Sequence, residues 1–131
     1  MLFRSIGSTT NGTSVRLANA AGSTVTVTMD SATSSIIAGG TTQNDSLRIA
    51  EAGTATLIQS AGTVTANQFV TIGDNLGSVG TYNMSGGILN VKASNAATPA
   101  LVVGRAGTGT FNISDTAAVT VKNGEIGRAH V

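Results

Sequence analysis

The sequence lacks several residue types on which common functions depend. Its 131 residues include no cysteine, no tryptophan, one proline and one histidine. Without cysteine the chain can form no disulfide and offers no thiolate to a metal ion. Aromatic residues make up 3% of the chain, too few to fill a thick core with large rings. We therefore expect a narrow core built from Val, Ile, Leu and Ala.

Charge is equally sparse. Charged residues make up 10% of the chain, and the formal net charge is +1. That balance provides no basic field to hold nucleic acid or an anionic membrane, so we expect no nucleic-acid partner. No apolar run approaches the roughly 20 residues that span a bilayer, so we expect no membrane insertion by this segment.

What the chain does contain is an internal repeat. Residues 47–66, 70–91 and 101–121 align with one another. Thr56, Thr81 and Thr110 correspond and lie 25 and 29 residues apart, and Ser60, Ser85 and Ser114 keep the same two spacings. Repetition at such a period is typical of solenoid proteins, in which each repeat buries its apolar face against the next one.

Each repeat contains three short runs of alternating apolar and polar residues, separated by Gly, Asn or Asp. In the second repeat Tyr82 and Met84 alternate with Thr81 and Asn83. Alternation of this kind predicts strands, and the small residues between the runs predict turns. No stretch shows helical spacing with caps. We therefore predict an all-β fold, a right-handed parallel β-helix (solenoid) of about three to four rungs.

Stacked rungs would bury one continuous column of apolar side chains. The residues predicted to form it are Ile49, Leu57, Ile72, Tyr82, Met84, Leu89, Val103, Phe111, Ile113 and Val119. The earlier residues fit the repeat less well, and predicted strands at 14–18, 24–29 and 34–40 would form one more, degenerate rung. A β-sandwich is the alternative architecture. The internal copies and the lack of aromatic anchors favour the β-helix.

Both ends of the chain match a translated sequencing adapter. Residues 125–131, EIGRAHV, correspond to the translation of the adapter GAGATCGGAAGAGCACACGTC. Residues 1–5, MLFRS, correspond to GTGCTCTTCCGATCT in its reverse complement, read from a GTG start codon. We therefore expect residues 1–5 and 125–131 to be non-native and to add nothing to the core. Residues 6–124 would then be a β-helix repeat fragment of a longer protein, and His130 would not be a native residue.

The polar residues offer one constellation to consider for catalysis. Glu51 and Asp74 occupy the same predicted turn of successive repeats, and Arg105 occupies that turn of the next. Acid–base catalysis would need two such carboxylates brought together. The simpler interpretation is solvated turn residues whose ion pairing contributes well under 1 kcal/mol. We favour that interpretation.

Other motifs are weaker still. The stretch GRAGTG at 104–109 has no following Lys-Ser/Thr and no following helix, so it is a turn rather than a phosphate loop. Alternating threonines at 24–28 are typical of flat ice-binding faces, but the aligned positions in the other repeats vary. The chain therefore has no assigned catalytic, cofactor-binding or metal-binding residue, and we expect it not to be an enzyme and to need no cofactor.

Two segments of the sequence resemble a known family: LVVGRAGTGTFNIS at 101–114 and GTYNMSGGILNV at 80–91. They resemble the β-strand repeats of bacterial autotransporter passenger domains and adhesin-like surface proteins, over residues 47–121. The resemblance implies an extracellular or cell-surface β-helix that serves as stalk, spacer or adhesion surface. Its partners would be a surface polysaccharide or a host or neighbouring cell. The chain departs from the pattern at Asp115-Thr116, where the glycine pair is lost.

Two alternatives to this function stay open. The chain could be a non-catalytic slice of a β-helical polysaccharide-processing enzyme, or a carbohydrate-binding region. The latter normally presents exposed rings, and the candidates are Phe69, Tyr82 and Phe111, two of which are predicted core residues.

Whichever function applies, each rung forms hydrogen bonds to the next, so the last rung, 117–124, should leave an unpaired edge. We expect the isolated chain to self-associate end to end.

Overall fold

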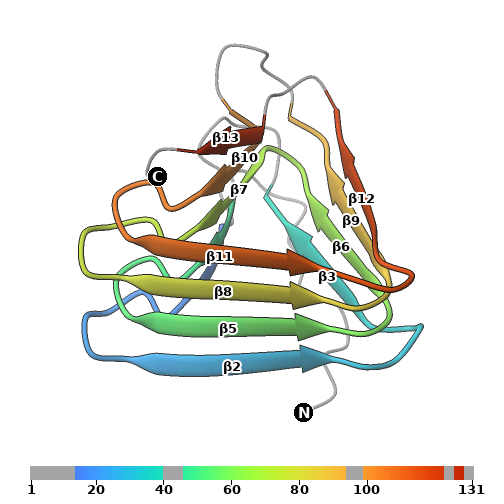
Figure 1. The fold of residues 1–131 in the computed structure, drawn as a ribbon, viewed down its shortest axis with the longest axis horizontal. Coiled ribbons are helices and arrows are strands. Elements are labelled where there is room, and N and C mark those ends of the chain that lie inside the picture. Colours follow the sequence, from blue (N-terminus) through green and yellow to red (C-terminus); the bar gives the residue numbers. More distant parts are fainter. Residues whose placement is uncertain (1–13, 40–45, 94–98, 123–125, 129–131) are drawn as a thin grey trace.

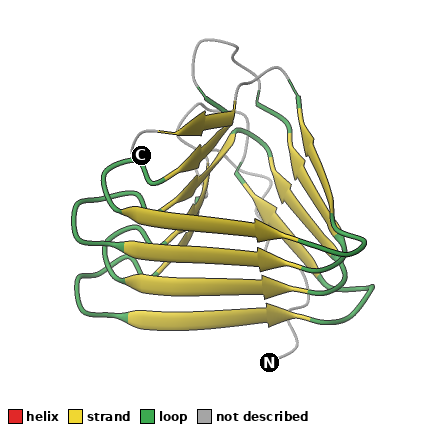
Figure 2. Ribbon diagram, in the orientation of Figure 1, coloured by secondary structure: helices red, strands yellow, loops and turns green. Residues whose placement is uncertain are grey.

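The computed structural model describes residues 14–39, 46–93, 99–122 and 126–128, and these form strands and turns. The chain winds as a three-sided coil (Figures 1 and 2). The strands are β1 (Val15–Leu17), β2 (Thr24–Met29), β3 (Ser35–Ala38), β4 (Ser46–Ile49), β5 (Thr54–Gln59), β6 (Thr63–Ala66), β7 (Phe69–Ile72), β8 (Val79–Met84), β9 (Ile88–Val91), β10 (Leu101–Val103), β11 (Thr108–Ile113), β12 (Ala118–Val121) and β13 (Ile126–Arg128). Among these residues there is no helix of the length and apolarity needed to cross a bilayer.

Every third strand along the chain lies in the same sheet. Sheet 1 has the order β1-β4-β7-β10-β13, sheet 2 the order β11-β8-β5-β2 and sheet 3 the order β12-β9-β6-β3. All the strand pairs are parallel. In Figure 1 sheet 2 runs from left to right in front, each turn lies above the one before, and the chain returns behind. The predicted right-handed parallel β-helix is confirmed, and the β-sandwich is excluded.

The register agrees with the aligned repeats. Thr81 pairs with Thr56 on one side and with Thr110 on the other. The ladder continues into the next corner, where the amides of Ser85 and Ser114 donate to the carbonyls of Gln59 and Met84, at 2.9 Å each. The predicted extra rung also forms, because β1, β2 and β3 pair with β4, β5 and β6.

Threonines align more regularly than the sequence comparison indicated. Thr26 pairs with Thr56, so four threonines stand in one row across sheet 2. A second row contains Thr24, Thr54 and Thr108, with Val79 between Thr54 and Thr108. The expectation that these positions vary between rungs is confirmed for two of the three rows, since the second contains Val79 and the row of Thr28 contains Ile58 and two asparagines. It was wrong only for the row that contains Thr26 and Thr56. It failed because a short strand pattern such as Thr-x-Thr can be aligned in several ways until the partner strands fix the register.

The core is the predicted narrow column, except in the last turn. Leu57, Ile72, Tyr82 and Leu89 are buried, together with Ile49 and Met84. The predicted core residues of the last turn, Val103, Phe111 and Val119, pack against the column but are half-buried. Ile113 was wrongly predicted to be buried, since 54% of it is exposed. Its position points inward like that of Met84, its partner in β8, but no described strand lies on the next level of sheet 2.

The corner between sheets 1 and 2 begins in the same way in every turn. Ala18, Ala50, Gly73 and Gly104 take φ values of 49°, 62°, 74° and 71°. This left-handed conformation suits glycine, and alanine adopts it at a cost of about 1–2 kcal/mol. The repeated conformation turns the chain sharply out of sheet 1, and the corners therefore stack directly on one another.

This corner alternates in length from turn to turn. The residues between the two strands number six, four, six and four, at 18–23, 50–53, 73–78 and 104–107. Each long corner closes with a serine: the Oγ atoms of Ser23 and Ser78 donate to the carbonyls of Ala20 and Asn75, at 2.6 and 2.7 Å. The structural repeat of this corner is therefore a pair of turns.

Each short corner packs a glycine against the long corner before it. A Cβ atom on Gly53 would lie 2.3 Å from the Ser23 carbonyl oxygen, and one on Gly107 would lie 2.7 Å from the Ser78 carbonyl oxygen. The following amides, those of Thr54 and Thr108, donate to these same carbonyls at 2.8 Å. The serine corner and the glycine corner thus form a matched pair.

The structure describes part of the C-terminal segment but not the N-terminal one. Residues 1–5, which we expect to be adapter-derived, lie outside the described residues. Of residues 125–131, the backbone of 126–128 forms β13 and pairs with β10, Leu101 facing Ile126. This backbone therefore joins sheet 1, and the expectation that the tail adds nothing to the core stays a prediction. The origin of these residues stays a prediction.

Candidate functional site

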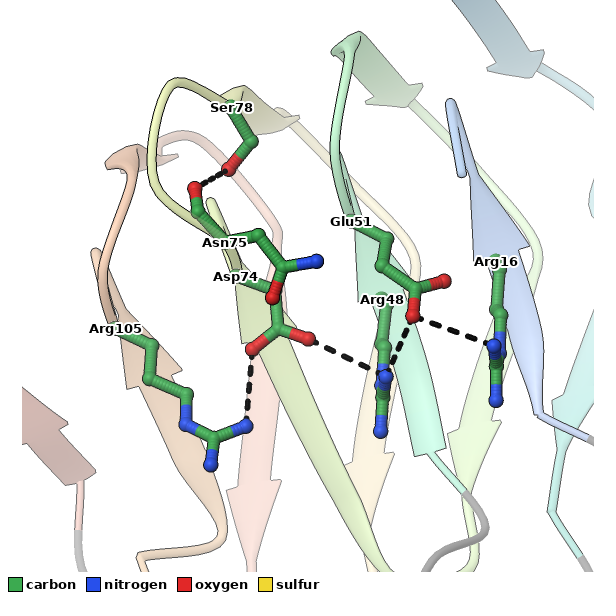
Figure 3. A network of polar contacts seen from close by, with 7 residues as sticks. All are labelled: Arg16, Arg48, Glu51, Asp74, Asn75, Ser78 and Arg105. Carbon is green, nitrogen blue, oxygen red and sulfur yellow. Dashed lines mark hydrogen bonds and ion pairs between the residues drawn. The ribbon is translucent and has the colours of Figure 1, made fainter. Parts of the chain in front are cut away.

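The charged residues singled out from the sequence lie along one side of the coil, where sheet 1 turns toward sheet 2. Arg16 and Arg48 occupy paired positions on β1 and β4. Glu51 follows β4, Asp74 follows β7 and Arg105 follows β10. Because the corners stack, these five side chains form a file that crosses all the turns (Figure 3). We call this file the ion-pair ladder.

Opposite charges alternate along the ladder. The Glu51 Oε1 atom lies 2.7 Å from Arg48 Nη1 and 3.3 Å from Arg16 Nη1. The same Arg48 Nη1 atom lies 3.4 Å from Asp74 Oδ2, and Arg105 Nη1 lies 3.1 Å from Asp74 Oδ1. Arg48 is thus the central cation, shared between two carboxylates from different turns.

The centre of the ladder is shielded from water. The side chain of Asp74 is 1% exposed, that of Glu51 11% and that of Arg48 18%, whereas Arg105 at the end is 61% exposed. The interpretation of Glu51 and Asp74 as solvated turn residues was therefore wrong. Stacking is the physical reason: the amide of Asn75 donates to the Glu51 carbonyl, so each corner covers the one beneath it.

The chemistry available to this ladder is dominated by its arginines. Each Asp74 oxygen lies beside a different guanidinium, so neither faces a vacant position. The Glu51 Oε2 atom is buried without a hydrogen-bond partner. Three guanidinium groups and two carboxylates leave one net positive charge. An arrangement of this kind can bind turns to one another, and its carboxylates are held by cations rather than turned toward a substrate.

Sequence reasoning identified Glu51, Asp74 and Arg105 but missed Arg16 and Arg48. A signal for them was present. Arg16 stands in VRL and Arg48 in LRI, each between two apolar residues of a short strand. Alternation places such an arginine on the outer face of the sheet. The first rung was the least regular in sequence, and this matching pair was therefore not aligned.

A second polar cluster lies inside the coil. Gln59 is fully buried, and its Nε2 atom donates to the carbonyls of Gly62 and Ile88 at 3.0 and 3.2 Å. Its Oε1 atom accepts a hydrogen bond from the Tyr82 hydroxyl. Burial raises the pKa of the Tyr82 phenol above its usual range, because the core disfavours the charged form. This cluster joins sheet 2 to the corner leading to sheet 3.

The Tyr82→Phe variant is expected to lose about 1–3 kcal/mol of unfolding free energy, because Gln59 Oε1 would stay buried without a donor. Urea unfolding monitored by circular dichroism measures this loss. In the Tyr82→Phe/Gln59→Leu variant the loss from the tyrosine change should be smaller, since no acceptor remains to be orphaned. Equal losses in both backgrounds would contradict the hydrogen bond.

Other sequence candidates are not brought into a site. Among the described residues no group of three or more acidic or histidine side chains could hold a metal ion. The GRAGTG stretch lines an open hollow of about 650 Å³ together with the corner at 76–79, and no charged side chain lines it. Of the rings proposed for a carbohydrate-binding region, Tyr82 is buried and stacks on half-buried Phe111 at 5.0 Å, and Phe69 is half-buried.

Comparison with known proteins identifies no relative from which a function could be inferred. The ion-pair ladder, the Gln59–Tyr82 cluster and the threonine rows are therefore the features from which a function can be argued. The chain matches no protein family, no curated protein and no solved structure.

Proposed function

We propose that this chain is a structural and adhesive repeat segment of a large secreted or cell-surface bacterial protein, with no catalytic role. The observation that carries the proposal is the ion-pair ladder. Three of its four ion pairs join one turn of the coil to the next: Arg16 to Glu51, Arg48 to Asp74 and Arg105 to Asp74. Charges used in this way hold a stalk or spacer in register along its length.

The outer face of sheet 2 supplies the adhesive surface in this proposal. It carries no charged side chain, and its hydroxyl and amide groups stand in rows that are interrupted only by exposed Ile58 and Val79. Asn112 Nδ2 donates to Asn83 Oδ1 at 2.8 Å, which continues the rows as an amide ladder. The polar side chains of this face are Thr24, Thr26, Thr28, Thr54, Thr56, Thr81, Asn83, Thr108, Thr110 and Asn112.

A neutral polysaccharide is the partner that this face fits best. Its hydroxyl groups both donate and accept hydrogen bonds, as do threonine and asparagine side chains. Neighbouring strands are about 4.8 Å apart, and alternate residues on a parallel strand are about 6.6 Å apart. The face therefore repeats its donors and acceptors in two directions, and an extended neutral chain could contact several rows at once.

Retention of the chain on insoluble neutral polysaccharides, measured by pull-down, tests the adhesive role. The Thr56→Lys/Thr81→Lys variant should be retained at least tenfold less than the original chain. The matched control is Thr63→Lys/Thr65→Lys on β6, which adds the same charge to sheet 3 and should be retained like the original.

Two results would overturn this assignment. Equal retention of the two double variants would show that sheet 2 is not the adhesive face. If the original chain shapes growing ice crystals and is retained by no polysaccharide, the threonine rows bind ordered water and the polysaccharide partner is wrong.

A further inference from the structure

One row of threonines on the outer face of sheet 2 is complete. The register places a threonine on each of the four strands, in the order Thr26, Thr56, Thr81 and Thr110. We call these four residues the central threonine row. Figure 1 shows the four strands lying one above another, so the row crosses them and runs parallel to the axis of the coil. The rows on either side of it are both interrupted, which makes this row the longest line of identical polar groups on the face.

The hydroxyl groups of this row are not used inside the protein. None of the four residues is buried, and no hydrogen bond joins their hydroxyls to another group in the part of the chain that the structure describes. The amides of the next row differ, because the Asn112 amide already donates to Asn83. A threonine hydroxyl donates one hydrogen bond and accepts two, so the central threonine row offers unused donors and acceptors in a line.

Two exposed apolar side chains flank the row. Ile58 follows Thr56 by two residues on β5, and Val79 precedes Thr81 by two residues on β8, so the two lie on opposite sides of the row. Ile58 is 37% exposed and Val79 43%, and each stands about 6.6 Å from the row, the spacing of alternate residues on a parallel strand. A line of hydroxyls with apolar contacts beside it matches a sugar chain, whose rings carry hydroxyl groups at their edges and C–H groups on their faces.

We propose that sheet 2 binds an extended, β-1,4-linked neutral polysaccharide whose chain lies along the central threonine row, with Ile58 and Val79 in contact with its C–H groups. This inference rests on the proposed adhesive function, and it adds the linkage of the sugar chain and its direction on the face. The interval from one strand to the next is constant at about 4.8 Å, so the row follows a straight line. A β-1,4-linked chain is a straight ribbon and can therefore follow it.

Other ligand classes and directions fit the face less well. Along a strand the outward positions differ in chemistry, since those of β8 are Val79, Thr81 and Asn83. An α-1,4-linked chain coils, because its linkage turns each sugar relative to the one before, and it would leave a flat face after a short contact. The four strands carry no charged residue that could pair with the carboxylates or sulfates of an anionic polysaccharide. Neutrality, β-linkage and direction along the row therefore describe one class of ligand.

Insoluble cellulose and granular starch test the linkage, because both are neutral glucans and they differ in whether the linkage is β or α. In a pull-down the original chain should be retained at least tenfold more by cellulose than by starch. Equal retention, or stronger retention by starch, would keep the adhesive function and overturn this inference. Retention by neither glucan would also overturn it, and the adhesive function would fall with it only if every other neutral polysaccharide failed to retain the chain as well.

Two double variants on the same two strands test the direction. Thr26→Val/Thr56→Val removes two hydroxyls from the central threonine row, and the matched control Thr24→Val/Thr54→Val removes two from the row beside it. Valine has the shape of threonine and suits a strand, and circular dichroism checks that both variants fold. Retention on cellulose should fall about tenfold for the first variant, the effect of losing two hydrogen bonds, and less than about threefold for the second. Equal retention of the two variants, or a larger loss for the second, would show that the ligand does not lie along the row and would overturn the inference.

Discussion

Replacing Arg48 by methionine is expected to lower the free energy of unfolding by about 3 kcal/mol, the lower end of the range for breaking a buried ion pair. The variant leaves Glu51 and Asp74 shielded from water without the cation that they share. The loss is at the lower end because Asp74 keeps Arg105 and Glu51 keeps Arg16. Urea unfolding monitored by circular dichroism measures it.

The matched control is Arg105→Met, which removes the same charge from the exposed end of the ladder. Its ion pair is open to solvent on the arginine side, so we expect a loss of about 1 kcal/mol or less. Added salt should weaken the contribution of Arg105 more than that of Arg48, since buried pairs are screened less. Equal losses for the two variants would show that burial does not determine the strength of the ladder.

The same burial changes what is expected of the two carboxylates. As solvated turn residues, Glu51 and Asp74 could both be replaced by alanine without effect. In the structure that double variant would strand the guanidinium of Arg48 between the corners, and it should destabilise the fold measurably. Unfolding midpoints close to that of the original chain would restore the earlier interpretation.

The Gly53→Ala variant is expected to cost about 3 kcal/mol, the upper end of the range for overpacking. Its new Cβ atom would lie 2.3 Å from the Ser23 carbonyl oxygen and 2.7 Å from that of Ala20. Both are backbone atoms, so the two corners would have to separate. Gly22→Ala is the comparison, since no atom lies within 4 Å of its Cβ position and its φ of +79° is the only strain.

We expect Gly22→Ala to cost about 1 kcal/mol, from the left-handed conformation alone. Chemical unfolding of the two variants side by side gives both values. If Gly53→Ala costs no more than Gly22→Ala, the corners have enough freedom to absorb a methyl group, and the close stacking of turns does not contribute to stability.

The architecture could be predicted because local pattern and repetition point to the same structure. Alternation gave the strands, and the aligned threonines at 56, 81 and 110 gave their register. The ion-pair ladder could be predicted only in part. Which corner residues share a file follows from the alignment, but their burial depends on how tightly one corner covers the next. The fit between corners depends on Ala50 and Gly73, which both adopt the left-handed conformation. Because one is an alanine and the other a glycine, the sequence does not show that they occupy equivalent positions.

Predictions failed most at the last turn. Ile113 belongs to the apolar column by sequence, yet a side chain is buried only when another turn lies above it, and no sequence pattern states which turn is last. The strand at 126–128 was missed for a related reason. Any short segment without proline can pair with an open parallel edge, since pairing uses backbone groups that all such residues possess.

The alternation of serine and glycine corners sets the unit in which such a coil can be lengthened. Gly53 packs against Ser23, and Gly107 packs against Ser78, which lies 55 residues after Ser23. Insertion of a single turn would place two corners of the same kind next to each other. Either two six-residue serine corners would clash, or a glycine corner would lack the serine corner against which it packs. Tandem duplication of a whole pair of turns preserves every contact. Evolution and protein engineering alike should therefore extend this chain by even numbers of turns, with recombination points between one pair and the next.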